Sequence, residues 1–175
     1  MRGSWYDHYE VTVEGTRKLL DLCNKKKVRK FVHVSSMGIL NYRYIKNGQL
    51  VNESSDLEQY PDKRGYYTKA KLLQENVVKE FCNNSKLNIT IVRPGIIIGH
   101  DKPSMLSDVG FRISNIVLHI GIKKRILRII NLDNLVNYIL ASSQIEITKG
   151  KIYNALDYEL PNSIEYIKST VDSDQ

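Results

Sequence analysis

The sequence lacks the marks of several large protein classes. No apolar run approaches the roughly 18–20 residues that a membrane-spanning helix needs, and no apolar segment follows Met1, so we expect neither a bilayer span nor secretion. The two cysteines, Cys23 and Cys82, and the four histidines have no metal-ligand spacing, so we expect buried thiols in a reducing cytoplasm and no metal site. Four prolines and ten glycines in 175 residues exclude a collagen-like chain.

Composition and charge are those of a basic globular protein. Hydrophobic residues make up 42% of the chain and charged residues 26%, which is ordinary for one domain of this length. The net charge is +7, and lysine and arginine cluster at residues 25–30 and 123–125. Such clusters are most often solvated surface at the end of a helix, but they also suit an anionic partner. Few aromatic residues lie among them, so they do not favour binding of single-stranded nucleic acid.

Helical and strand-like patterns alternate along the chain, which predicts an α/β fold with a mostly parallel sheet. We expect helices at residues 9–25, 66–81 and about 109–119, and after caps at Asp133 and at Asn162 or Ser163. We expect strands at 31–34, 89–92, 126–130 and 151–155, and a long polar loop from 38 to 65. The first helix would bury one stripe of side chains: Val11, Gly15, Leu19, Leu22 and Cys23. His33, inside the first strand, is expected to be a core histidine with satisfied hydrogen bonds.

A tyrosine four residues before a lysine places both side chains on one face of a helix. The chain holds two such pairs, Tyr67/Lys71 and Tyr42/Lys46, and chance alone predicts about one in a chain of this composition. Tyr42 lies in the polar loop, whereas Tyr67 opens a clear helix that follows a strand ending in two serines. The context therefore favours Tyr67 and Lys71 as the pair with a chemical role.

These residue types can carry proton and hydride chemistry together. A free tyrosine has a pKa of about 10, and a nearby ammonium lowers that pKa because it favours the phenolate. The tyrosinate can then take a proton from a substrate alcohol, while a serine hydroxyl holds the substrate oxygen. Because side chains do not accept hydride, a nicotinamide would have to accept it.

Four short motifs occur in order along the chain: VEGT at 13–16, FVHVSS at 31–36, YTKAK at 67–71 and VRPG at 92–95, followed by Gly99. As an ordered set they resemble the extended short-chain dehydrogenase/reductase family, the NAD-dependent epimerase/dehydratase group, which includes sugar-nucleotide epimerases and 3β-hydroxysteroid dehydrogenases. The resemblance covers most of the chain. It implies an NAD(P)-dependent oxidoreductase, epimerase or dehydratase acting on a hydroxyl-bearing substrate, a sugar nucleotide or a sterol-like alcohol, with NAD or NADP as cofactor.

The resemblance also implies roles for individual residues. Tyr67 would be the catalytic acid/base, Lys71 its activator and a ribose ligand, and Ser36 the catalytic serine, with Ser35 as the alternative. The cofactor-binding residues would be Tyr67, Lys71, Pro94, Gly95 and Ile96. Asp133 matches a substrate-side segment of the family, although we expect it first to cap a helix.

Two departures from the family pattern concern the cofactor site. Thr12 stands where the family usually has an asparagine, and no Gly-x-x-Gly-x-x-Gly turn is present. We therefore expect residues 1–175 to form a single domain, the C-terminal two-thirds of an NAD(P)-binding Rossmann-like fold: a truncated, doubly wound sheet with a small C-terminal substrate-side portion. Such a chain would be a fragment or half of a split enzyme, working as a homodimer through the helices at 9–25 and 66–81 or with a complementing N-terminal chain. The alternative is a non-catalytic relic or binding module whose basic surface takes an anionic partner.

Overall fold

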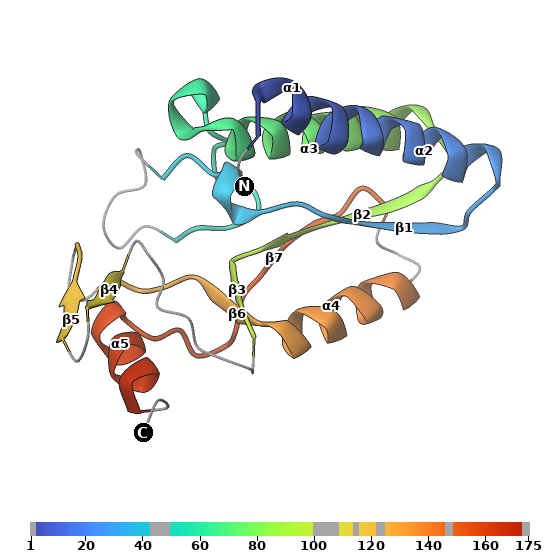
Figure 1. Cartoon of the computed structure of the whole chain (residues 1–175). Coiled ribbons are helices and arrows are strands. Elements are labelled where there is room, and N and C mark those ends of the chain that lie inside the picture. The colour runs from blue at the N-terminus through green and yellow to red at the C-terminus, as the bar shows by residue number, and fades with distance from the viewer. Residues whose placement is uncertain are drawn as a thin grey trace. The chain divides into compact units, whose positions relative to one another are not determined.

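The computed structural model describes residues 3–42, 50–99, 109–113, 116–121, 125–145 and 149–172 (Figure 1). Its internal contacts divide the chain into two compact units. The first comprises Met1–Pro94 and Tyr138–Asn154, and the second comprises Gly95–Asn137 and Ala155–Gln175. The single domain expected over residues 1–175 stays a prediction.

A three-stranded sheet in the order β1-β2-β7 is the centre of the first unit. β1 (Lys30–Val34) and β2 (Asn88–Pro94) run parallel, with Phe31 opposite Ile89. β7 (Ile152–Ala155) lies on the other side of β2. All three confirm strands expected from the sequence, and the run of β-branched apolar residues in β2 suits a central strand that is buried on both faces.

A long helical segment precedes the sheet in the sequence. α1 (Trp5–His8) continues through a π-helical stretch, η1 (Tyr9–Glu14), into α2 (Gly15–Lys25). The segment begins before the predicted residue 9 because Ser4 and Asp7 form a capping box. The hydroxyl of Ser4 accepts a hydrogen bond from the Asp7 amide, and the Asp7 carboxylate accepts one from the Ser4 amide. π-helical stretches such as η1 are rare, and they often occur at functional sites.

The longest helix among the described residues, α3 (Tyr66–Asn84), confirms the helix predicted at 66–81 and continues three residues beyond it. Figure 1 shows α2 and α3 on the same side of the sheet, and one buried cluster joins the helices to β2. Its members are Val13, Leu20, Val77, Val78, Cys82, Leu87, Ile89 and Ile91. Each large aliphatic side chain buried in this way contributes roughly 1.5–3 kcal/mol to the free energy of unfolding.

The stripe of the first helix that is buried differs from the predicted one. Val11, Leu19 and Leu22 are exposed, whereas Val13 and Leu20 are buried against α3. The prediction was wrong because the buried stripe contains a threonine, Thr16, which made it look less apolar than the stripe that faces solvent. Burial of that hydroxyl is tolerated because it is fully hydrogen-bonded, as described below. Cys23, also in the predicted stripe, is half-buried and packs against the core as expected.

The polar segment between β1 and α3 is irregular, as predicted. It contains two short 3-10 turns, η2 (Met37–Ile39) and η3 (Pro61–Arg64), and an isolated antiparallel bridge between Leu40 and Leu57. Residues 43–49, which include Lys46 of the second Tyr/Lys pair, lie outside the described residues. The hydroxyl of Tyr42 donates to the carbonyl of Met37.

The described strands of the second unit form two small sheets. β3 (Ile96–Ile98) pairs with β6 (Ile129–Asn131) in parallel, whereas β4 (Gly110–Ile113) and β5 (Ile116–His119) form an antiparallel pair. The helix predicted around 109–119 was therefore wrong. This segment is rich in β-branched residues, which favour strands, and a Cβ at Gly110 would approach the Leu118 carbonyl to 2.5 Å, so glycine permits the close pairing. β6 is shorter than the predicted strand at 126–130.

The two helices that follow β6 and β7 begin at asparagine caps. In α4 (Leu132–Gln144) the side-chain oxygen of Asn131 accepts from the Asp133 amide at 2.9 Å, so Asn131 caps the helix. The expected cap at Asp133 was wrong by two residues, and Asp133 lies in the first turn. In α5 (Ser163–Asp172) the side-chain oxygen of Asn162 accepts from two backbone amides, which selects Asn162 over Ser163 as the cap.

Within the described residues, no helix is both long and apolar enough to cross a membrane. In that part of the chain, no three His, Cys, Asp or Glu side chains gather as ligands for a metal ion. Cys23 and Cys82 are both free thiols; Cys82 is buried, as expected, whereas Cys23 is only half-buried.

Candidate active site

Lys71 is held at the carboxyl end of β1. Its half-buried ammonium donates to the carbonyl of Val34 at 2.8 Å and to the side-chain oxygen of Gln74 at 2.6 Å. An ammonium has three donors, so one N–H is left for a ligand once the two acceptors among the described residues are counted. Burial lowers the pKa of Lys71 to about 8, and the negative charge of Glu75 offsets part of that effect. Lys71 is therefore cationic at neutral pH and poised close to its titration point.

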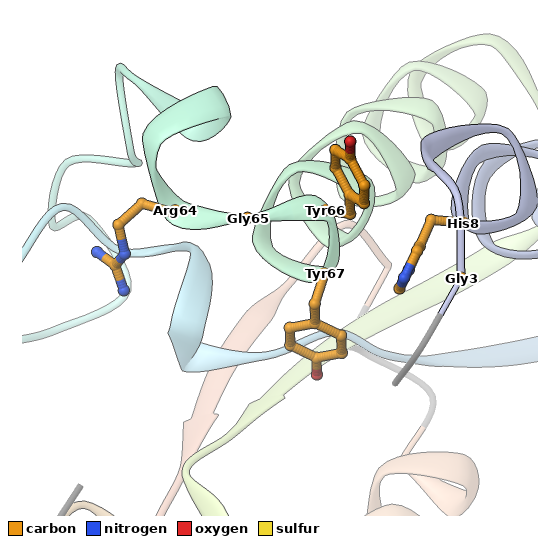
Figure 2. Close-up of a pocket in the computed structure, with 6 residues that line it drawn as sticks. All are labelled: Gly3, His8, Arg64, Gly65, Tyr66 and Tyr67. Atoms are coloured by element: carbon orange, nitrogen blue, oxygen red, sulfur yellow. The ribbon is translucent and has the colours of Figure 1, made fainter.

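Tyr67 lies one turn before Lys71, at the start of α3. The residue is 46% exposed, so its side chain is open to solvent. The helix begins after Gly65, whose φ of 83° is a conformation that favours glycine. Figure 2 shows the rings of Tyr66 and Tyr67 pointing in different directions from the first turn of α3. Both residues line a hollow of about 270 Å³. The hollow is lined by Gly3, His8, Arg64, Gly65, Tyr66 and Tyr67.

Aromatic contacts from α1 hold this first turn of α3 in place. The ring of Trp5 lies 5.8 Å from that of Tyr9 and 6.0 Å from that of Tyr66, measured between centroids. His8 lies 6.0 Å from Tyr66, and the ammonium of Lys69 lies 4.3 Å above the ring of Trp5. These tilted ring contacts and the cation–π contact are each worth on the order of 1 kcal/mol, and together they position the turn that carries the candidate tyrosine.

The two serines after β1 have different environments. Ser35 is buried, and its hydroxyl donates to a carboxylate oxygen of Glu75 at 2.6 Å. Ser36 is half-buried, and its oxygen accepts from the Gly38 amide at 3.0 Å while no described residue accepts its proton. Because only the Ser36 hydroxyl keeps a proton for a substrate oxygen, the geometry favours Ser36 over Ser35 for the catalytic role.

A buried ion pair lies behind the serines. The guanidinium of Arg93, on β2, donates to both carboxylate oxygens of Glu75, on α3, at 3.0 and 2.6 Å, and both side chains are almost fully buried. Burial alone would raise the pKa of Glu75, but hydrogen bonds from Arg93, Lys79 and Ser35 outweigh it and hold that pKa at about 2. This bidentate pair fixes α3 to β2 just below the site.

His33 is buried beside this network but lacks a hydrogen bond to its Nε2 atom among the described residues. The expectation of a satisfied core histidine was therefore wrong, although its burial was predicted. The apolar strand around it supplies no partner for that nitrogen. Burial and the positive charge of Lys71 lower the pKa of His33 to about 4. The imidazole is neutral at physiological pH.

This lowered pKa predicts a loss of stability in mild acid. The unfolded chain takes up a proton at His33 near pH 6.5 and the folded chain only near pH 4, so the unfolded state binds more protons between these values and stability falls as the pH falls. We expect a loss of up to about 3 kcal/mol over this range. In His33→Phe this part of the pH dependence should vanish. Urea unfolding at several pH values from 7 to 4 measures it, and equal pH profiles for both proteins would contradict the assignment.

A family model decides the classification of the chain. The model, described as male sterility protein and named for NAD binding, matches residues 4–143. The chain belongs to this NAD-binding family. Its place among the extended short-chain dehydrogenases/reductases, predicted from the ordered motifs, is confirmed by relatives of the same kind.

Two curated relatives illustrate the range of this family. Short-chain dehydrogenase/reductase family 42E member 1 of Homo sapiens is 25% identical over 93% of this chain and 44% of its own length. Sterol-4-alpha-carboxylate 3-dehydrogenase of Candida albicans is 33% identical over 57% of this chain and 27% of its own length. The chain thus spans less than half the length of these curated relatives.

Solved structures of the same kind establish the fold. UDP-glucuronic acid 4-epimerase from Bacillus cereus, in complex with NAD, superposes with a TM-score of 0.73 at 19% identity, covering 99% of this chain and 56% of the epimerase. A short-chain dehydrogenase/reductase superfamily protein from Agrobacterium tumefaciens gives a TM-score of 0.72 over 99% of this chain and 61% of its own. The predicted Rossmann-like α/β fold is confirmed, and the chain corresponds to somewhat more than half of these structures.

In a chain of an NAD-binding family, the residues predicted to contact the cofactor need groups that are available to it. The remaining N–H of Lys71 fits a ribose hydroxyl, which accepts hydrogen bonds. The segment from Pro94 to Ile96 offers less. Proline has no N–H, the Gly95 amide donates to the Ala155 carbonyl, and the Ile96 amide donates to the carbonyl of Arg128. These backbone amides are therefore unavailable to a ligand, and the exposed side chain of Ile96 is what this segment offers.

Glycine at position 95 has a packing explanation as well. A Cβ there would collide with the carbonyl of Arg128 and would lie 2.7 Å from the side chain of Leu156. The glycine is therefore required by the second unit itself, with or without a cofactor. Gly95 and Ile96 belong to that unit, whereas Tyr67 and Lys71 belong to the first.

Sequence reasoning missed three residues that contact the candidate site. Glu75 and Gln74 follow Lys71 on α3, and Thr16 comes from α2. One signal could have identified Glu75: an acid on the inward face of a helix, matched by Arg93 in an apolar strand, predicts a buried ion pair. No comparable signal marks Gln74 or Thr16, because polar residues at the edge of a buried stripe are common.

Proposed function

We propose that these residues are the catalytic part of an NAD(P)-dependent oxidoreductase, epimerase or dehydratase that acts on a hydroxyl-bearing substrate. The observation that carries the proposal is the position of Lys71, fixed between Val34 and Gln74 one turn after the exposed Tyr67, in a chain of an NAD-binding family. Two of its relatives are named a sterol-4-alpha-carboxylate 3-dehydrogenase and a UDP-glucuronic acid 4-epimerase, which supports a sterol-like alcohol or a sugar nucleotide as substrate.

Each residue has a defined part in this mechanism. Tyr67 accepts the proton of the substrate hydroxyl from its position one turn before Lys71 on α3. Ser36 donates its free hydroxyl proton to the substrate oxygen and stabilises the charge that develops there. The third N–H of Lys71 binds a ribose hydroxyl. When bound, the nicotinamide supplies the hydride acceptor that no side chain can provide.

Two partners are compatible with the surface of the first unit. Val11, Leu19 and Leu22 form an exposed apolar stripe on the η1–α2 helix, which supports a homodimer through the helices predicted for it. Among the described strands, β1 is an edge of its sheet, and a nucleotide-binding segment that added a strand there would complete the fold. The match to somewhat more than half of the solved relatives supports this second partner.

Cofactor binding by Lys71 can be tested directly with NADH and its fluorescence. We expect the protein to bind NADH in the micromolar range and Lys71→Met to bind at least about tenfold more weakly, because a charge-assisted hydrogen bond is lost. Lys69→Met is the matched control: this lysine lies two residues away on α3 but contacts Asp62 and Trp5. Sedimentation velocity on the same samples reports the oligomeric state.

The outcomes of this titration separate the proposals. Equal affinities for the wild type and Lys71→Met would remove Lys71 from the cofactor site. No binding by a folded chain would assign cofactor binding to residues outside this sequence and leave the binding-module alternative for the chain alone. A monomer at all concentrations would contradict the homodimer.

A further inference from the structure

A chain of hydrogen bonds connects Lys71 to the π-helical stretch η1. The ammonium of Lys71 donates to Oε1 of Gln74 at 2.6 Å, and Nε2 of Gln74 donates to the hydroxyl of Thr16 at 2.7 Å. The Thr16 hydroxyl in turn donates to the carbonyl of Thr12, also at 2.7 Å. The chain thus crosses from α3 to α2 and ends in η1, at the residue that replaces the asparagine of the family.

The chemistry of the groups allows this chain only one direction. Lysine donates hydrogen bonds and cannot accept them, so Gln74 must turn its oxygen toward Lys71. A threonine hydroxyl has a single proton, and that proton is committed to the carbonyl of Thr12. Thr16 can therefore only accept from the amide nitrogen of Gln74. Both ends fix the same orientation of the glutamine amide.

We propose that Gln74 is a positioning residue for Lys71: its amide, held by Thr16, fixes the direction in which the Lys71 ammonium presents its remaining N–H to a ligand. The proposal rests on the proposed function, because that N–H is the one assigned to the cofactor ribose. Because the ammonium donates to both the Val34 carbonyl and the Gln74 amide, it cannot rotate without losing a hydrogen bond. Thr16 is buried and Gln74 is half-buried, so water does not readily replace the hydrogen bond between the Gln74 amide and the Thr16 hydroxyl.

A neutral amide also leaves the charge balance around Lys71 unchanged. The ammonium faces the carboxylate of Glu75 on α3, which Arg93 and Lys79 already neutralise, and the neutral imidazole of His33 on β1. A glutamate at position 74 would add a negative charge at the same distance as the present oxygen. It would also remove the donor to Thr16. Gln74 therefore orients the ammonium and leaves it without a further negative charge beside it.

Amine labelling of Lys71 as a function of pH tests this proposal without a cofactor or a substrate. Trace acetylation with acetic anhydride, read out by mass spectrometry, gives the apparent pKa and the reactivity of this lysine in the folded chain. Gln74→Glu should raise the apparent pKa from about 8 by at least about one pH unit. Thr16→Val frees the glutamine amide and should increase the labelling rate severalfold, whereas Thr16→Ser keeps the hydroxyl and should match the wild type.

The proposal is overturned if folded Thr16→Val labels like the wild type, or if Gln74→Glu leaves the apparent pKa unchanged. Circular dichroism confirms that each variant is folded, and Lys69 in the same samples serves as the internal reference for labelling. This result is independent of the NADH titration. If Gln74→Glu shifts the pKa of Lys71 as expected but the wild-type protein binds NADH no better than Lys71→Met, the proposed function is wrong. The positioning role of Gln74 then still holds.

Discussion

Arg93→Met is expected to destabilise the protein by about 3–5 kcal/mol, because it leaves the carboxylate of Glu75 buried without its main partner. Such a loss is a large fraction of the roughly 5–15 kcal/mol by which small domains are stable. Lys79 and Ser35 still contact Glu75, but Lys79 reaches it from a partly exposed position. Urea unfolding at neutral pH, followed by circular dichroism, measures the change.

Two further variants show whether the cost comes from an unpaired buried charge. Arg17→Met removes an exposed ion pair with Glu14, one turn earlier on the same helix, and should cost less than about 1 kcal/mol. The double variant Arg93→Met with Glu75→Leu removes both charges and should recover much of the loss. If the double variant is less stable than Arg93→Met alone, the charge-burial explanation is wrong.

Tyr67→Phe is expected to reduce turnover by roughly 10²- to 10⁴-fold in the whole protein that contains these residues, which is the usual worth of a general acid or base. The change removes only the hydroxyl oxygen, so the ring and the start of α3 should keep their positions. Turnover is measured as NADH formation with a sterol-like alcohol or a sugar nucleotide.

Tyr66→Phe is the matched control for this experiment. Tyr66 is the preceding residue and is exposed to a similar degree, but its ring packs against Trp5 and His8. It should lose less than about threefold in turnover, since it has no place in the proposed proton transfer. Full activity in Tyr67→Phe, or equal losses in both variants, would remove Tyr67 from the acid/base role.

The parts of this fold that could be predicted from sequence are those specified by local patterns. β1, β2 and α3 were predicted because their apolar residues have the period of a strand or a helix over their whole length. The segment around β4 and β5 was not, because short apolar runs without clear punctuation fit a helix and a strand equally well. The pairing of the two strands, which a local window does not contain, decides between them.

The candidate site shows the same division. Tyr67 and Lys71 are four residues apart, so the helix alone places them on one face. The link between Gln74 and Thr16 joins residues 58 positions apart, and it exists only after α2 packs against α3. Burial of Thr16 in place of Leu19 could not be foreseen, because the partner that satisfies its hydroxyl lies on another helix. Tertiary hydrogen bonds of this kind decide which face of an ambiguous helix turns inward.

The π-helical stretch η1 also sets the phase between the two ends of the first helix. In an α-helix each residue turns the chain by about 100°, so one residue more or fewer in Tyr9–Glu14 would rotate α1 by that angle relative to α2. In the present phase Trp5 and His8 both contact Tyr66, and a rotation of about 100° would turn them away from it. The length of η1 therefore links the packing of α2 in the core to the aromatic contacts around the candidate tyrosine. A single-residue insertion or deletion in this stretch should therefore disturb the aromatic contacts, even at a surface position such as Val11.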